Sequence, residues 1–335
     1  MGKNVLTVKD LKTFYKTRLN EYVYAVDGVS FDLRSGEILG IAGESGCGKS
    51  TLSLSLMGYY FPPLHYKSGV IEIDGTDIMK LKYDNLRVGF LGTKISYIPQ
   101  AAMNALNPTM RVINFIQDIA EEHKLGMTKE QVYNMAKERF LALNLPERTL
   151  GAYPNELSGG MKQRTVIAIS AMLNPEILIA DEPTSALDVT TQKVVIKMMK
   201  DLMNKSFVKS IIFITHELPL LRHIADRIIV MYAGQFVEMG TSEEIIFSPL
   251  HPYSKALMGS IIVPEKGMKD QKLSCIPGAP PNLKHVPEGC RFADRCLYAE
   301  SECRQGDIEE KYYNGRMYKC IFDYEKLKEL YGYEQ

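Results

Sequence analysis

The sequence predicts an α/β fold built around a mainly parallel β-sheet, and three observations lead to this prediction. Short apolar β-rich segments alternate with helical segments along most of the chain, a pattern that favours parallel strands joined by helices. One such segment, residues 37–42, runs directly into a glycine-rich turn that is followed by a helical segment. Between about 104 and 170 the apolar residues change to helical spacing, which predicts a helical insert in the sheet-based domain.

The expected elements follow from this pattern in chain order. Strands are predicted at 5–8, 29–33, 37–42 and 70–73, a helix at 51–57, amphipathic helices at 112–120 and 132–143, and buried strands at 177–180 and 211–215. From about 248 prolines become frequent and interrupt any long element. We therefore predict one domain at 1–246, with its helical insert at about 104–170, and a C-terminal extension at 247–335.

Composition limits the partners and the compartment. Lysine plus arginine number 40 and aspartate plus glutamate number 40, so zero net charge predicts no nucleic-acid partner and no bulk attraction to anionic lipid. The N-terminus lacks the pattern of a secretory signal peptide, and no apolar run approaches the roughly 20 residues that span a bilayer. We expect a chain that stays in the cytosol, where thiols remain reduced.

Residues 43–50, GESGCGKS, match the phosphate-binding pattern G-x-x-x-x-G-K-[ST] between an expected strand and an expected helix. Glycines let backbone N–H groups face phosphates, and the N-terminus of the helix adds its positive end. Lys49 is expected to reach the β and γ phosphates, and the Ser50 hydroxyl to bind Mg²⁺. The predicted nucleotide contacts are Gly43, Glu44, Ser45, Gly46, Cys47, Gly48, Lys49, Ser50 and Thr51.

Cys47 within this loop has two interpretations. A thiol at a helix N-terminus beside Lys49 is expected to have a lowered pKa. The alternative is a small residue that merely fits the loop.

Two acids, Asp181 and Glu182, end the apolar strand predicted at 177–180. Neighbouring side chains on a strand point to opposite faces, so the two carboxylates need not share one task. Asp181, at the strand end, is a candidate Mg²⁺ ligand, and Glu182 is a candidate general base that orients and deprotonates water. The alternative is a solvated strand end.

Further motifs in the same order resemble those of the ABC ATPases. The segment 157–163, LSGGMKQ, resembles the family's signature, Gln100 its Q-loop, and 185–188, SALD, its D-loop. His216 resembles the switch histidine, and Tyr15, with Phe14 as the neighbouring candidate, sits where the family stacks an aromatic ring on adenine. The resemblance covers about residues 5–245 and implies a P-loop NTPase cassette with a RecA-like, mainly parallel sheet, a β-subdomain and a helical subdomain.

The resemblance also implies which cofactors are bound and which residues act on them. It implies that ATP and Mg²⁺ are bound between two cassettes that meet head-to-tail. In such a pair the signature of one subunit faces the phosphates held by the other, which implies nucleotide contacts from Ser158, Gly159, Gly160 and Asp188. The implied catalytic residues are Glu182, His216 and Gln100, and the implied Mg²⁺ ligands are Ser50, Gln100 and Asp181.

The later part of the chain is similar to one subfamily, the oligopeptide/dipeptide importers. The segments that carry this similarity are NALNP at 104–108, HPY at 251–253, IPGAPP at 276–281 and the cysteine-rich tail. It implies an ATP-hydrolysing subunit on the cytoplasmic face of the membrane, bound to two transmembrane permease subunits and a paralogous ATPase subunit, with an extracytoplasmic binding protein that delivers di- or oligopeptides. The alternatives are import of an oligosaccharide or nickel, or a soluble ABC ATPase of DNA repair, chromosome structure or the ribosome.

The tail gathers four of the six cysteines, separated by 5, 6 and 16 residues: Cys290, Cys296, Cys303 and Cys320. Reduced thiols disfavour disulfides, and these gaps match neither tight zinc pairs nor common ferredoxin spacings, so spacing alone does not choose a metal. The subfamily resemblance implies a [4Fe–4S] cluster in a small metal-bound extension, with zinc and then free thiols as alternatives. Cys47 and Cys275 are not expected to be ligands.

Overall fold

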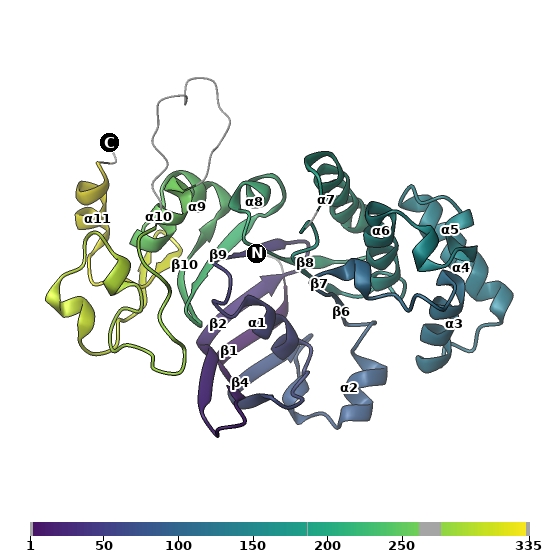
Figure 1. Ribbon diagram of the computed structural model, residues 1–335, viewed down its shortest axis with the longest axis horizontal. Coiled ribbons are helices and arrows are strands. Elements are labelled where there is room, and N and C mark those ends of the chain that lie inside the picture. The colour runs from purple at the N-terminus through teal and green to yellow at the C-terminus, as the bar shows by residue number, and fades with distance from the viewer. Residues whose placement is uncertain (1–2, 186, 261–275, 333–335) are drawn as a thin grey trace.

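Two β-sheets lie at the centre of the molecule, a helical group lies at one end and the C-terminal segment at the other (Figure 1). The structure is a computed structural model that describes residues 3–185, 187–260 and 276–332. Among these residues, no helix combines the length and apolarity that crossing a bilayer would require.

The larger sheet has eight strands in the order β11-β12-β10-β9-β3-β8-β7-β6. Its parallel part, from β9 to β6, consists of β3 (Ile38–Ala42), β6 (Ile95–Ile98), β7 (Ile177–Asp181), β8 (Ser210–Thr215) and β9 (Arg227–Tyr232). Every residue of β3, β7 and β8 is buried, as expected for parallel strands covered on both faces. The antiparallel strands are β10 (Gln235–Thr241), β11 (Lys311–Tyr313) and β12 (Arg316–Tyr318).

The smaller sheet is antiparallel, with the order β2-β1-β4-β5. Its strands are β1 (Asn4–Lys16), β2 (Tyr22–Arg34), β4 (Leu64–Ile73) and β5 (Thr76–Asp77). The predicted strands at 5–8, 29–33 and 70–73 lie inside these longer strands. Helix α1 (Lys49–Leu56) contacts both β2 and β7, so it lies between the two sheets.

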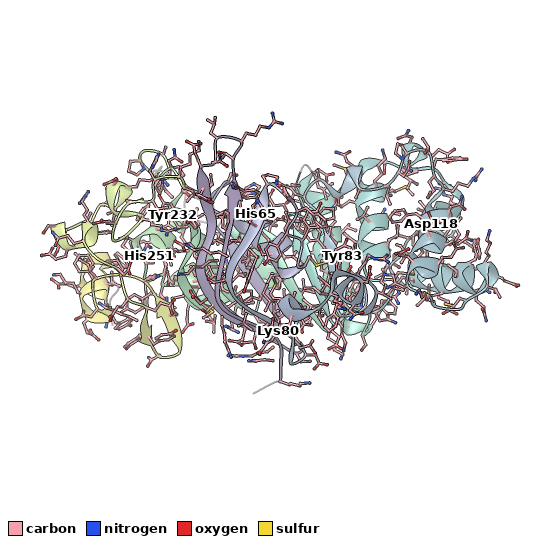
Figure 2. The ribbon with its side chains drawn as sticks, turned by 90° about the horizontal axis from the view of Figure 1, so that it is seen from below. His65, Lys80, Tyr83, Asp118, Tyr232 and His251 are labelled. Carbon is pink, nitrogen blue, oxygen red and sulfur yellow. The ribbon has the colours of Figure 1, made fainter. Side chains whose placement is uncertain are left out.

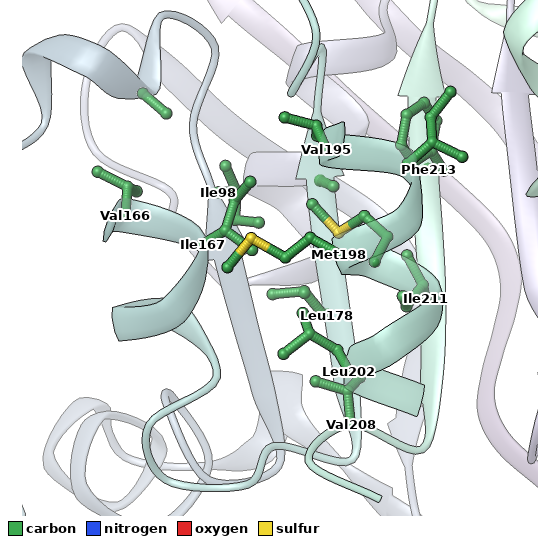
Figure 3. Packing of buried hydrophobic residues seen from close by; sticks show 14 of the residues in the cluster. Ile98, Val166, Ile167, Leu178, Val195, Met198, Leu202, Val208, Ile211 and Phe213 are labelled. Carbon is green, nitrogen blue, oxygen red and sulfur yellow. The ribbon is translucent and has the colours of Figure 1, made fainter. Parts of the chain in front are cut away.

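Helices fill most of the segment predicted as a helical insert, and the last of them contacts the main sheet at β6. The segment contains α3 (Val112–Glu122), α4 (Lys129–Ala142), α5 (Arg148–Gly151) and α6 (Gly159–Ser170). Thr128 and Gln131 form a capping box at the start of α4, which satisfies backbone N–H groups at the helix N-terminus. Residues of α6 and α7 (Val189–Asn204) pack on residues of the sheet in one apolar layer (Figure 3). Helix and strand residues of this layer include Ile98, Val166, Ile167, Leu178, Val195, Met198, Leu202, Ile211 and Phe213, with Val208 from the loop before β8.

Shorter elements complete the described part of the chain. The helices are α2 (Tyr83–Gly89), α8 (Leu218–Ile224), α9 (Ser242–Phe247), α10 (Pro252–Gly259) and α11 (Tyr324–Tyr331). The 3-10 helices are η1 (Ile78–Lys80), η2 (Ala102–Asn104), η3 (Pro154–Glu156), η4 (Ala293–Arg295) and η5 (Ser301–Arg304).

The C-terminal extension is joined to the main sheet, since β12 pairs with β10. A buried ion pair lies at this junction, where Arg316 Nη2 is 2.9 Å from Glu238 Oε1. Burial raises the pKa of Glu238, while the backbone N–H groups of Leu250 and His251 and the charge of Arg316 oppose the rise. The domain boundary near residue 246 stays a prediction. The β10–β12 pairing and the Glu238–Arg316 ion pair connect residues on its two sides.

We expect Arg316→Met to lower the free energy of unfolding by about 3–5 kcal/mol, because the Glu238 carboxylate would stay buried without its cation. Chemical denaturation of the purified chain measures this change. Arg304→Met is the matched control, because Arg304 pairs with Asp294 on the surface and such pairs contribute little. Equal stability of the two variants would contradict the importance of the buried pair.

Candidate nucleotide-binding site

The carboxyl ends of four neighbouring parallel strands bring the predicted site residues to one edge of the main sheet. Gly43 follows β3, Gln100 follows β6, Glu182 follows β7 and His216 follows β8. Because β3 lies beside β8, β8 beside β7 and β7 beside β6, these ends are adjacent in space. Ligands of open parallel sheets bind at this edge.

The glycine-rich loop is closely packed against its surroundings. A Cβ atom on Gly43 would lie 2.2 Å from the Met231 carbonyl oxygen, and one on Gly48 would lie 2.0 Å from that of Ala25. Gly48 also has a φ of 111°, in the region that favours glycine. Lys49 Nζ donates hydrogen bonds to the carbonyl oxygens of Gly43 at 2.8 Å and Glu44 at 2.9 Å, so its ammonium group lies over the loop.

The other loop residues predicted to contact nucleotide fall into two groups. Ser45 and Gly46 are exposed at the tip of the loop. Thr51 lies in α1, and its hydroxyl is 3.2 Å from that of Tyr15 on β1. The neighbouring Phe14 stacks on His65, with ring centroids 5.4 Å apart. Of the two aromatic candidates, Tyr15 is thus the one that contacts the helix after the loop.

The expectation of a lowered pKa for Cys47 is wrong. The residue is only 5% exposed, and burial raises the pKa of its thiol, although the charge of Lys49 opposes the rise. A Cβ on Gly43 would lie 2.8 Å from Cys47 Sγ, so the thiol fills space inside the loop. The alternative interpretation, a small residue that fits the loop, agrees with this packing.

Asp181 ends β7 as a fully buried carboxylate. Tyr97 donates a hydrogen bond to its Oδ2 at 3.2 Å, whereas its Oδ1 makes no hydrogen bond within the described residues. Burial raises the pKa of Asp181, and the nearby hydroxyls of Ser50 and Tyr97 lower it. An unpartnered carboxylate oxygen close to a hydroxyl is a fitting donor set for Mg²⁺, which prefers oxygen ligands.

Glu182 brings the three predicted catalytic residues together. Its Oε2 accepts a hydrogen bond from Gln100 Nε2 at 3.1 Å, and its Oε1 lies 2.9 Å from His216 Nδ1. The φ of Glu182 is 48°, a left-handed conformation that costs a non-glycine residue about 1–3 kcal/mol. Its backbone N–H donates to the Ile214 carbonyl oxygen at 2.9 Å, which fixes this turn against β8.

The signature and the D-loop lie at two helix N-termini. Ser158 caps α6, and its Oγ accepts the Met161 N–H at 3.4 Å. Asp188 caps α7 by accepting the N–H groups of Thr190 and Thr191, each at 3.0 Å. The Thr191 hydroxyl and backbone N–H hold the pKa of Asp188 below its usual range. Within the described residues, Ser158, Gly159, Gly160 and Asp188 form no hydrogen bond with residues 43–51.

One contact at the site was not anticipated from the sequence. Gln163, the last residue of the signature segment, is buried and donates a hydrogen bond from Nε2 to the Pro183 carbonyl oxygen at 2.6 Å. It therefore ties α6 to the turn that follows Glu182. The one sequence signal for a role of Gln163 is its position in the LSGGMKQ segment.

The four C-terminal cysteines lie near one another. Burial raises the pKa of Cys320 to about 12, and the other three thiols add to the rise. Cys290 N–H donates to the Cys303 carbonyl oxygen at 2.7 Å, and Glu300 N–H donates to Cys303 Sγ at 3.5 Å. These contacts hold the segments that carry Cys290 and Cys303 side by side.

The side-chain geometry nevertheless does not form a metal site. In the part of the chain that the structure describes, no three His, Cys, Asp or Glu side chains are arranged to hold a metal ion. The metal-bound extension predicted from the sequence, with iron–sulfur or zinc, is thus not supported by this arrangement. Cys275 lies outside the described residues, and Cys47 belongs to the phosphate loop.

Comparisons with known proteins agree with this geometry. Residues 26–185 match the family described as ABC transporter, and residues 237–303 match the family described as oligopeptide/dipeptide transporter, C-terminal region. A solved structure, a dimeric post-hydrolysis state of the ATP-binding cassette MJ0796 bound to ADP and Pi, is 28% identical with a TM-score of 0.61, and the match covers 71% of this chain and 98% of that one.

The chain is similar over most of its length to transporter subunits. It is 43% identical to the oligopeptide transport ATP-binding protein OppD of Bacillus subtilis, covering 88% of this chain and 82% of that protein. It is 38% identical to the dipeptide transport ATP-binding protein DppD of Caldanaerobacter subterraneus, covering 90% and 91%.

The fold and the phosphate loop therefore define the class: the chain is an ABC cassette ATPase of the P-loop NTPase fold, whose ligands are ATP and Mg²⁺. Within that class it belongs to the family of ATP-binding subunits of oligopeptide and dipeptide transporters. The predictions of the cassette fold and of the family are both confirmed.

We expect Glu182→Gln to retain ATP binding and to lower hydrolysis by about 10²–10⁴-fold, the usual loss when a general base is removed. Phosphate release by the assembled transporter, together with nucleotide titration, measures both quantities. Glu176→Gln is the matched control, because Glu176 precedes β7 at the opposite end of the same strand and pairs with Lys94 and Lys209. Near-normal turnover of Glu182→Gln would exclude this carboxylate as the base.

Proposed function

We propose that this chain hydrolyses ATP to power the import of dipeptides or oligopeptides through a membrane ABC transporter. The observation that carries the proposal is the contact of Glu182 with both Gln100 and His216 beside the phosphate loop. The assignment of a peptide substrate rests on the matched C-terminal region and on the relatives, which are named for oligopeptide and dipeptide transport.

The proposal assigns tasks to the residues of the candidate site. Lys49 and the N–H groups of the glycine-rich loop bind the phosphates, and Tyr15 stacks on adenine. Ser50, Asp181 and Gln100 hold Mg²⁺, which when bound neutralises phosphate charge.

Glu182 is proposed to accept the proton of the attacking water. Its hydrogen bonds to Gln100 and His216 hold the carboxylate in place at 3.1 Å and 2.9 Å. Gln100 also orients the water, and His216 contacts the γ-phosphate.

The signature and D-loop residues require a second cassette. Ser158, Gly159, Gly160 and Asp188 lie at the N-termini of α6 and α7, which favour anions. Since they make no hydrogen bond with the phosphate loop of their own chain in the described part, we propose that they bind ATP held by a partner. That partner is proposed to be a paralogous ATPase subunit arranged head-to-tail.

The permease contact is proposed at a groove between the sheet and the helical insert. A cavity of about 240 Å³ opens there, lined by residues that include Tyr97, Pro99, Leu106, Phe115 and Ile119. Its apolar lining and its place beside Gln100 suit the docking of a helix from each of two membrane-spanning permeases. Such docking places the chain on the cytoplasmic face of the membrane, opposite the extracytoplasmic binding protein that delivers the peptide, and it involves no nucleic acid.

A reconstituted transporter tests the substrate. We expect ATP hydrolysis by the complex of both ATPase subunits, both permeases and the binding protein in proteoliposomes to rise when a dipeptide or oligopeptide is added. An oligosaccharide or Ni²⁺ serves as the control, because these are the cargoes of the alternative importers. Stimulation by either of these and not by peptide would overturn peptide import while leaving the ATPase assignment intact.

We also propose that the four C-terminal thiols bind a metal, as a [4Fe–4S] cluster or, alternatively, zinc. The support is their mutual proximity, with the Cys290 N–H bound to the Cys303 carbonyl oxygen at 2.7 Å, and the Glu300 N–H that donates to Cys303 Sγ at 3.5 Å. Its role would be structural, since the tail carries none of the residues proposed to contact ATP.

Metal analysis of anaerobically purified protein tests this proposal. We expect about four irons per chain, and Cys296→Ser should abolish the brown colour. Cys47→Ser is the control and should keep the metal. A colourless protein with one tightly held zinc would replace iron–sulfur with zinc, and protein free of both metals would remove the proposal.

A further inference from the structure

Glu44, the second residue of the phosphate loop, is held from three directions. Its backbone N–H donates to the Tyr253 hydroxyl at 2.9 Å, and its carbonyl oxygen accepts from Lys49 Nζ at 2.9 Å. Its carboxylate accepts two hydrogen bonds from Arg295, from Nη1 at 2.7 Å and from Nη2 at 2.9 Å. Tyr253 and Arg295 both belong to the predicted C-terminal extension, so this part of the chain contacts the ATP site directly.

Arg295 is itself fixed by the extension. It ends η4, between Cys290 and Cys296, and its side chain is 6% exposed. Its Nε donates to the Pro277 carbonyl oxygen at 2.8 Å, and its Nη1 also donates to the Tyr232 hydroxyl at 3.2 Å. The planar guanidinium matches the carboxylate with two parallel bonds, a geometry that lysine cannot reproduce.

The HPY segment explains how Tyr253 reaches the loop. His251 caps α10 by accepting the Tyr253 N–H on Nδ1 at 3.0 Å, and Pro252 is the first residue of the helix. Burial lowers the pKa of His251 to about 3, so the ring stays neutral and Nδ1 remains an acceptor. His251 and Tyr232 lie on the side of the molecule that carries the C-terminal segment (Figure 2).

The ring of Tyr253 is locked by aromatic packing. It is fully buried, with centroids 4.5 Å from the Tyr232 ring and 5.3 Å from the Phe292 ring. Phe292 lies three residues before Arg295, so the same short segment supports both contacts to Glu44. The hydroxyl of Tyr253 is therefore presented to the loop by a rigid group.

We propose that Tyr253 and Arg295 are positioning residues for the ATP site, through which the C-terminal extension sets the conformation of the phosphate loop. The link to the phosphates is short, because the Glu44 carbonyl oxygen is bound by Lys49, the residue that must reach the nucleotide. Displacement of the Glu44 peptide would shift Lys49 and the neighbouring N–H groups together. The inference rests on ATP binding at this loop and is independent of the transported cargo.

Two conservative variants of the full-length chain test the proposal. Tyr253→Phe removes only the hydroxyl that accepts the Glu44 N–H, and Arg295→Gln removes the paired bonds to the carboxylate. We expect each to raise the dissociation constant for MgATP about two- to thirtyfold, the range of coupling carried by residues that do not touch the ligand. Titration with a fluorescent ATP analogue measures the affinity, and the thermal unfolding midpoint is recorded alongside.

Matched controls in the extension separate positioning from stability. Tyr331→Phe loses a hydroxyl that donates to the Leu250 carbonyl oxygen, and Arg304→Gln loses a surface pair with Asp294. Both should keep the affinity for MgATP within about twofold of the parent, whatever they do to the unfolding midpoint. Equal loss of affinity in the controls, or unchanged affinity in folded Tyr253→Phe and Arg295→Gln, would overturn the proposal.

A double-mutant cycle tests the contact itself. If Arg295 acts through the Glu44 carboxylate, Arg295→Gln combined with Glu44→Gln should bind MgATP no more weakly than the weaker single variant. If the losses of MgATP binding free energy in the two single variants add in full in the double variant, Arg295 acts through a contact other than the Glu44 carboxylate. Arg295→Lys should fall between the parent and Arg295→Gln, because it keeps the charge without the two parallel bonds.

Discussion

The site depends on the parallel register of β3, β8 and β7. Ala42 is paired with Thr215, and Asp181 with Ile214, so the three strands end at the same level. Asp181 is the last residue of β7, and the phosphate loop, Glu182 and His216 follow the strand ends directly, so they reach one edge without a long loop. A shift of one residue in any strand would exchange its side chains between two buried faces, so close packing on both faces fixes the register on which the site relies.

The sequence predicted this edge well because each of its motifs follows a short apolar strand. The sequence was less informative about strand lengths and pKa shifts, because these depend on packing between distant segments. The extent of β1 and β2 was missed, since their outer residues alternate little and are partly exposed. The predicted direction of the Cys47 pKa shift was wrong. The pattern GCGK reveals the nearby Lys49 charge, which lowers the pKa, but it does not reveal the burial of the thiol, which raises the pKa by more. Strands β11 and β12 have three residues each, too few to show a period.

The attachment of the extension was also invisible in the sequence. Two arginines carry much of it: Arg316 pairs with the buried Glu238, and Arg295 pairs with Glu44. The partners are 78 and 251 residues apart in the chain, and a balanced composition gives no sign of which charges meet. Both pairs join a cation of the extension to an acid of the cassette, so the extension is fixed to the cassette at two places.

The two neighbouring acids lie in separate surroundings because of the backbone more than because of strand alternation. Asp181 still belongs to β7 and lies in buried space near Ser50, where Mg²⁺ is proposed to bind. Glu182 leaves the strand through a left-handed turn, which its N–H bond to Ile214 holds in place. The strain of that turn is offset by the fixed neighbouring strand, and it directs the second carboxylate to Gln100 and His216. A regular strand would have sent Glu182 to the opposite face, away from both.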